Sequence, residues 1–70
     1  MEHFTDYHEA YNYAVEYARY SKKEVGIEKV KWFGKVGFVV QSLPKPENRY
    51  GHELRMEVVK PTDPHTKLGI

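Results

Sequence analysis

Tyrosine is the residue type that stands out in this sequence. Six of the 70 residues are Tyr, and five of them lie between residues 7 and 20. On a helical wheel, Tyr13, Tyr17 and Tyr20 fall beside one another at spacings of i, i+4 and i+7. A tyrosine ring offers a large apolar area with a polar tip, which is typical of protein interfaces. We therefore predict that these three residues bind another protein or a second copy of the chain as a homodimer. The alternative is that they pack beneath a loop or the C-terminal residues.

A second candidate site lies in the segment 44–55, where Pro44 and Pro46 predict a stiff loop. Binding residues are often found on loops that a rigid sheet holds in place. Arg49 could fork a carboxylate or phosphate of a partner. The alternative is ordinary loop chemistry, in which the same side chains shape the turn and cover the edge of the core. The residues predicted to contact a partner here are Asn48, Arg49, Tyr50 and His52.

Basic residues gather in the second half of the chain. Residues 1–26 contain three Lys and Arg against five Asp and Glu, whereas residues 27–70 contain eight against five. A basic sheet face can lie along a phosphate backbone, so nucleic-acid binding is the alternative function. Glu53 and Glu57 are expected on the same face, which weakens this hypothesis. The residues that would contact nucleic acid are Lys29, Lys31, Lys35 and Arg55.

Catalysis and metal binding find little support in the spacing of the polar residues. The four His do not follow metal-ligand spacing, and no HExxH motif is present. Glu53 and Glu57 would lie roughly 13 Å apart along a strand at ~3.3 Å per residue, too far for an acid–base pair. So short a chain also has little room for a closed pocket. We expect a non-enzymatic protein with no cofactor and no metal.

Composition restricts the class of protein further. With 70 residues the chain forms one domain at most. Cysteine is absent, which excludes disulfides and thiolate sites and favours a reduced compartment. The longest uncharged apolar run, Val36–Val40, is far shorter than the ~20 residues of a membrane-spanning helix. Met1–Phe4 lacks the basic and apolar regions of a signal peptide. We expect a cytoplasmic protein that does not associate with membranes.

The spacing of apolar residues predicts an amphipathic helix from Thr5 to Glu24. Thr5 stands where an N-cap belongs, because its hydroxyl can accept from a free N–H of the first turn. Gly26 can take the left-handed conformation that ends a helix. The residues expected on the buried face are Phe4, Tyr7, Tyr11, Ala14, Val15, Ala18 and Val25.

Three β-rich runs follow the helix, at residues 27–33, 36–43 and 52–60. They predict an α+β fold of order α-β-β-β, in which one helix crosses one face of a three-stranded antiparallel sheet. The domain is expected to span residues 1–60, with 61–70 as a flexible tail in which Leu68 and Ile70 could still dock. The strand residues expected to face the helix are Val30, Trp32, Val36, Phe38, Val40, Leu54, Met56 and Val58.

The register of the first hairpin has two solutions. A two-residue turn at 34–35 would place Trp32 opposite Gly37, whereas a three-residue loop over 33–35 places it opposite Val36. We favour the three-residue loop, because it keeps the large apolar residues on one face and a slip of one residue turns every side chain over. The helix residues then expected beneath Trp32 are Tyr11, Ala14 and Ala18.

Overall fold

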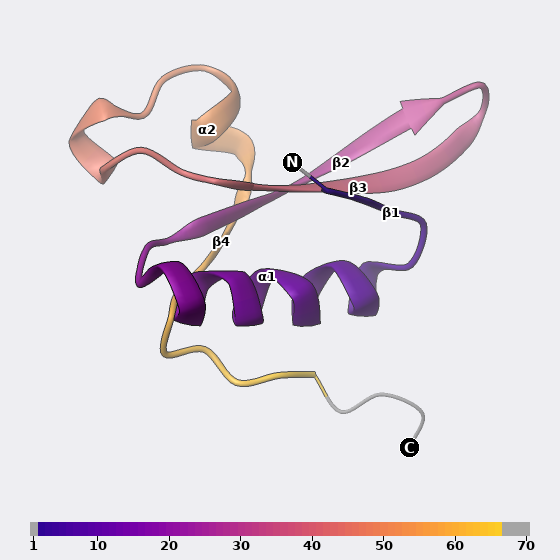
Figure 1. Cartoon of the computed structure of the whole chain (residues 1–70). Helices are drawn as coiled ribbons and strands as arrows, with labels where there is room; N and C mark the ends of the chain where they lie inside the picture. The colour runs from indigo at the N-terminus through magenta and orange to yellow at the C-terminus, as the bar shows by residue number, and fades with distance from the viewer. Residues whose placement is uncertain (1, 67–70) are drawn as a thin grey trace.

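The computed structural model describes residues 2–66 and confirms an α+β fold, with one main helix on one face of an antiparallel sheet (Figure 1). Its elements are β1 (Glu2–Phe4), α1 (Tyr7–Ser21), β2 (Val25–Trp32), β3 (Lys35–Ser42), the 3₁₀ helix η1 (Pro46–Asn48), α2 (His52–Arg55) and β4 (Glu57–Val59). The sheet has four strands in the order β1-β3-β2-β4, not the predicted three. The added strand is β1, which pairs antiparallel with β3 ahead of the helix.

The ends of α1 differ from the predicted ones. Asp6, not Thr5, is the N-cap, and its carboxylate accepts from the Glu9 N–H at 3.1 Å. A carboxylate is favoured there because the helix dipole is positive at its N-terminal end. At the other end Lys22 takes the left-handed conformation, with φ 59°, and its N–H donates to the Ala18 carbonyl. Gly26, the predicted end of the helix, lies inside β2.

The core lies between α1 and the sheet face beneath it. It consists of small and medium side chains: Ala10, Ala14, Val15 and Ala18 from α1, and Val25, Ile27, Val40 and Val59 from the strands. Phe4, Tyr7 and Tyr11 pack at its margin, so every residue predicted for the buried helix face contributes to the core. Phe4 and Val25 do so from strands and not from the helix. Alanines bring the helix close to the sheet, which leaves the large aromatic rings at the periphery of the core.

The hairpin between β2 and β3 adopts neither of the two expected registers. Its turn residues are Phe33 and Gly34, with φ of 47° and 80°, and Trp32 pairs with Lys35. Two consecutive positive φ angles characterise the two-residue turn whose twist matches that of the flanking strands. The favoured three-residue loop is therefore wrong, and so is the turn at 34–35.

This register turns β2 over relative to the prediction. Because Ile27 points into the core, alternation places Lys29 and Lys31 on the α1 side of the sheet and Trp32 on the opposite side. A Cβ on Gly37 would lie 2.7 Å from the indole of Trp32, so the ring covers Gly37 and not the helix. The predicted helix-facing positions of Val30 and Trp32 are wrong, whereas Phe38 and Val40 pack toward α1 as predicted. Val36 lies on the α1 side of the sheet but is exposed.

The predicted strand 52–60 is only partly a strand. Residues 52–55 form α2, and β4 pairs with β2 so that Val59 lies opposite Val25. Val58 consequently faces away from α1, and Leu54 is exposed on α2. Met56 is buried, but on the far face of the sheet against Gly26. The helix-facing positions predicted for Leu54, Met56 and Val58 are therefore wrong.

The segment that follows β4 lies along α1 as far as Thr66 (Figure 1). The predicted tail 61–70 is thus attached to the helix in its first part, and its last residues, with Leu68 and Ile70, lie outside the described residues. The contacts are Arg19 Nη2 to the Asp63 carbonyl at 2.9 Å, the Thr66 N–H to Asn12 Oδ1 at 2.8 Å, and His65 Nε2 to Glu16 Oε1 at 2.9 Å.

Replacing Lys22 by glycine tests the observed end of α1. A left-handed conformation costs an L-residue on the order of 1 kcal/mol that glycine does not incur. We expect Lys22→Gly to raise the free energy of unfolding by about 1 kcal/mol, measured by urea denaturation.

Gly26→Ala is the matched control at the predicted helix end. A Cβ there would lie 2.7 Å from Met56 Sδ and 2.9 Å from Leu43 Cδ2, so this substitution should lower the stability. A stabilising Gly26→Ala together with a destabilising Lys22→Gly would contradict the observed helix end.

Candidate functional site

The predicted tyrosine stripe, Tyr13, Tyr17 and Tyr20, lies along one flank of α1. Tyr13 is 38% exposed and Tyr20 is 89% exposed, whereas Tyr17 is half-buried against the core. The ring centroid of Tyr13 lies 5.2 Å from that of Phe4 in β1 and 6.1 Å from that of Tyr17. The segment after β4 contacts a different flank, at Asn12. The stripe is thus brought together as the helical spacing predicted.

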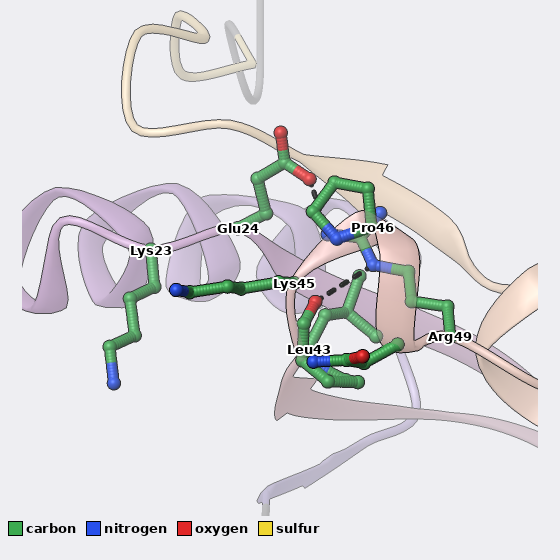
Figure 2. A pocket seen from close by; sticks show the side chains of 8 residues that line it. Lys23, Glu24, Leu43, Lys45, Pro46 and Arg49 are labelled. Atoms are coloured by element: carbon green, nitrogen blue, oxygen red, sulfur yellow. Dashed lines mark hydrogen bonds and ion pairs between the residues drawn. The ribbon is translucent and has the colours of Figure 1, made fainter.

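The second predicted site borders a cleft between the end of α1 and the loop after β3. Figure 2 shows this cleft, which has a volume of about 510 Å³. Its lining is Lys23, Glu24, Leu43, Pro44, Lys45, Pro46, Asn48 and Arg49. The two lysines bring positive charge to a largely apolar surface.

Arg49 is engaged within the chain. Its Nη2 pairs with Glu24 Oε1 and its Nε donates to the Pro44 carbonyl at 2.9 Å (Figure 2). The side chain is only 10% exposed. The guanidinium that we expected to fork an incoming anion therefore holds the loop against the beginning of β2.

The other predicted loop residues do not converge on one point. Asn48 lines the cleft together with Arg49, whereas Tyr50 and His52 are exposed and are not among its lining residues. His52 Nδ1 lies 3.6 Å from Glu28 Oε2 on β2. The loop thus divides into an internal anchor, which is the pair of Arg49 with Glu24, and an exposed part with Tyr50 and His52.

Removing Glu24 tests the anchor. Glu24→Ala would leave the partly buried guanidinium of Arg49 without its carboxylate, and the loss of a hydrogen bond to a charged group costs about 2 kcal/mol. We expect the free energy of unfolding to fall by about that amount in urea denaturation. Glu28→Ala, which removes a carboxylate 3.6 Å from an exposed histidine, is the matched control and should have a small effect. Equal effects of the two substitutions would argue against the anchor.

The basic residues predicted to bind nucleic acid do not share one sheet face. Lys29 and Lys31 lie on the α1 side, whereas Lys35 pairs with Trp32 and shares the opposite side. Arg55 lies on α2, apart from this hairpin. The flat basic face expected from the sequence is therefore not formed.

The far end of the β2–β3 hairpin carries three of the lysines predicted to bind nucleic acid, together with two aromatic residues, Trp32 and Phe33, that were not predicted as site residues. Residues 29–37, here called the hairpin arm, diverge from α1 in Figure 1. Phe33 is fully exposed at its tip and Trp32 is 39% exposed. A sequence signal for it existed, since no acidic residue stands between Glu28 and Glu47 while four lysines do.

Tyr7 has the most strongly altered proton affinity. Its hydroxyl donates to the Glu57 carboxylate, whose two oxygens both lie 2.7 Å away. Burial, followed by this hydrogen bond and the charge of Glu57, raises the pKa of Tyr7 from 10.0 to about 12. Burial, followed by the charges of Asp63 and Glu57, also raises the pKa of Tyr11. Both hydroxyls stay protonated near neutral pH, and that of Tyr7 ties α1 to β4.

The Tyr7 contact makes stability depend on pH in alkaline solution. Because the folded-state pKa of about 12 exceeds the value of 10.0 for a free tyrosine, the contribution is complete below pH 10 and is lost as the pH rises through 12. We expect the stability difference between the wild type and Tyr7→Phe to shrink across this window in urea denaturation. A constant difference for Tyr7→Phe would exclude this linkage.

Neither a metal site nor a membrane span is evident between residues 2 and 66. Within that range no three side chains of His, Asp or Glu group closely enough to hold a metal ion. No helix there has the length and apolar character needed to cross a membrane. The chain matches no family model, no curated protein and no solved structure.

Proposed function

We propose that this protein is a non-enzymatic binding protein whose hairpin arm binds single-stranded nucleic acid. The observation that carries the proposal is the exposed pair Trp32 and Phe33 set among lysines. Proteins that bind single strands stack bases on exposed aromatic rings and neutralise phosphates with basic side chains. This order reverses the one expected from the sequence, in which protein binding came first and a flat basic face second.

Phe33 occupies a position that disfavours its side chain. Its φ of 47° costs an L-residue on the order of 1–2 kcal/mol, and glycine, asparagine or aspartate is usual at this place in such a turn. The ring is fully exposed, so packing within the chain does not compensate for this cost. Strained residues at loop tips cluster at functional sites. A ligand that stacks on the ring would explain its presence.

Trp32 is held in place and remains accessible. Its ring lies on Gly37, and its centroid is 4.9 Å from that of His3 in β1. A Cβ at position 37 would lie 2.7 Å from the indole, so only glycine accommodates this packing without a shift. A ring fixed before binding loses little entropy when a base stacks on its exposed part.

The charges of the arm have a single sign. Lys29 and Lys31 lie on one side of the arm and Lys35 lies on the other, so a strand that passes the tip would meet positive charge on both sides. Lysine is depleted at protein–protein interfaces, whereas it is a common phosphate ligand in nucleic-acid complexes. The combination of aromatic rings with lysines therefore favours a nucleic-acid strand over a protein as the ligand.

Fluorescence titration tests the proposal directly, because Trp32 is the single tryptophan. We expect single-stranded oligonucleotides to quench it with a dissociation constant of 10⁻⁴–10⁻⁶ M near physiological salt, the usual range for non-specific binding. With about three phosphates neutralised, the affinity should fall about 20-fold between 50 and 200 mM salt.

Phe33→Ser should weaken this binding about tenfold, the effect expected for losing one stacked base. Tyr20→Ser, which removes another highly exposed ring, on α1, is the matched control and should leave the affinity unchanged. The same oligonucleotide in duplex form should bind the protein more weakly, because its bases are already stacked on one another. Absence of quenching at 50 mM salt, or equal losses in the two variants, would overturn the proposal. Equal binding to anionic lipid vesicles would reassign the arm to membranes.

A second candidate function, binding of a protein, is favoured by the exposure of Tyr20 and of Tyr50. These two rings lie on different elements, α1 and the loop before α2. In the loop, Arg49 is not free to bind a partner, because it is paired with Glu24. Only exposed side chains of the loop, such as Tyr50, remain for that role. The tyrosine stripe is therefore the stronger surface for a protein partner.

A further inference from the structure

We infer that α1 pairs with α1 of a second copy of this chain, in antiparallel orientation and through the tyrosine stripe. The stripe lies on α1, whereas the hairpin arm belongs to the far end of the sheet, so this inference does not depend on nucleic-acid binding. Shape and charge both favour a second copy of the chain as the partner of the stripe.

The stripe has a length and symmetry that suit pairing with itself. From Tyr13 to Tyr20 it spans roughly 10 Å at ~1.5 Å per residue. A two-fold axis that passes between residues 16 and 17 would place Tyr13 opposite Tyr20 of the second copy, and the reverse. Tyr13 is supported from behind by Phe4, at 5.2 Å between ring centroids, so it already stands in place. Each copy then covers the most exposed ring of the other.

The charges of α1 favour the antiparallel orientation. Its N-terminal end carries Asp6 and Glu9, and its C-terminal end carries Lys22 and Lys23. The same two-fold axis brings Glu9 to the C-terminal end of the second helix, opposite position 24 and next to Lys23. Glu24 itself is paired with Arg49 of its own chain. Antiparallel helix dipoles attract as well. A parallel pair would instead place like charges together at both ends.

The acidic residue nearest the axis is already in contact within the chain. Glu16 Oε1 lies 2.9 Å from His65 Nε2 of the segment that follows β4. This contact directs the Glu16 carboxylate toward that segment and away from the stripe. The centre of the proposed interface is therefore aromatic.

The association should be weak. A standard protein interface buries about 800 Å² per partner, and a strip three tyrosines long on one helix offers less than that. We expect a dissociation constant on the order of 0.1 mM, so that the protein is a monomer at about 10 µM and mostly a dimer near 1 mM.

Sedimentation over this concentration range tests the inference. The average mass of the wild type should rise toward that of a dimer, whereas Tyr20→Ser should stay a monomer throughout. Tyr50→Ser, which removes an exposed tyrosine outside the stripe, and Phe33→Ser in the arm should associate like the wild type. Circular dichroism verifies that each variant is folded. A wild type that stays monomeric, or association lost in Phe33→Ser and retained in Tyr20→Ser, would overturn the inference.

An exchange of charges tests the orientation. Glu9→Lys and Lys23→Glu should each weaken association when alone, because each places like charges opposite one another. An equimolar mixture of the two variants should associate again, since opposite charges then meet at both ends. Single variants that associate as well as the wild type, as expected of a parallel pair in which like charges already meet, or failure of the mixture to associate, would overturn the antiparallel arrangement. Neither substitution touches the hairpin arm, so oligonucleotide binding by the same variants separates this inference from the proposed function.

Discussion

The two-residue turn at Phe33 and Gly34 is the constraint on which the arrangement of this small sheet depends. Both residues hold positive φ, so the chain reverses without a third loop residue and fixes the pairing of β2 with β3. Because side chains alternate along a strand, this register decides the face of every residue in β2. It places Ile27 in the core and Trp32 on the far side of the sheet, and it leaves Phe33 at the tip.

The composition of the core complements this register. Ala14, Ala18 and the valines of the sheet fill the space beneath α1, so large rings have no place at its centre. They lie at its margins, where each takes a distinct role. Tyr7 ties α1 to β4 through Glu57, Tyr13 leans on Phe4, and Trp32 covers Gly37. Aromatic rings at the periphery of a core are available to ligands, so the two proposed binding surfaces are compatible with a chain of 70 residues.

The sequence was informative where one strong periodicity acted alone. The buried face of α1, with Ala14, Val15 and Ala18, and the gathering of the tyrosine stripe followed from helical spacing. The strand β1 has three residues, too few for an alternation to be recognised. The turn was missed because an aromatic residue rarely takes positive φ, so the rules of turn chemistry pointed elsewhere. The role of Arg49 depends on Glu24, 25 residues away in the chain, and only the folded structure brings the two together.

The chemical shift of the Gly37 Hα protons reports on the register of the hairpin. If Trp32 lies on Gly37, its ring current should move these protons upfield, and nuclear Overhauser effects should join the indole to Gly37 and His3. The shift should vanish in Trp32→Ala while the fold persists. Overhauser effects from the indole to Ala14 and Ala18, with unshifted Gly37 protons, would contradict the account and restore the register in which Trp32 faces the helix.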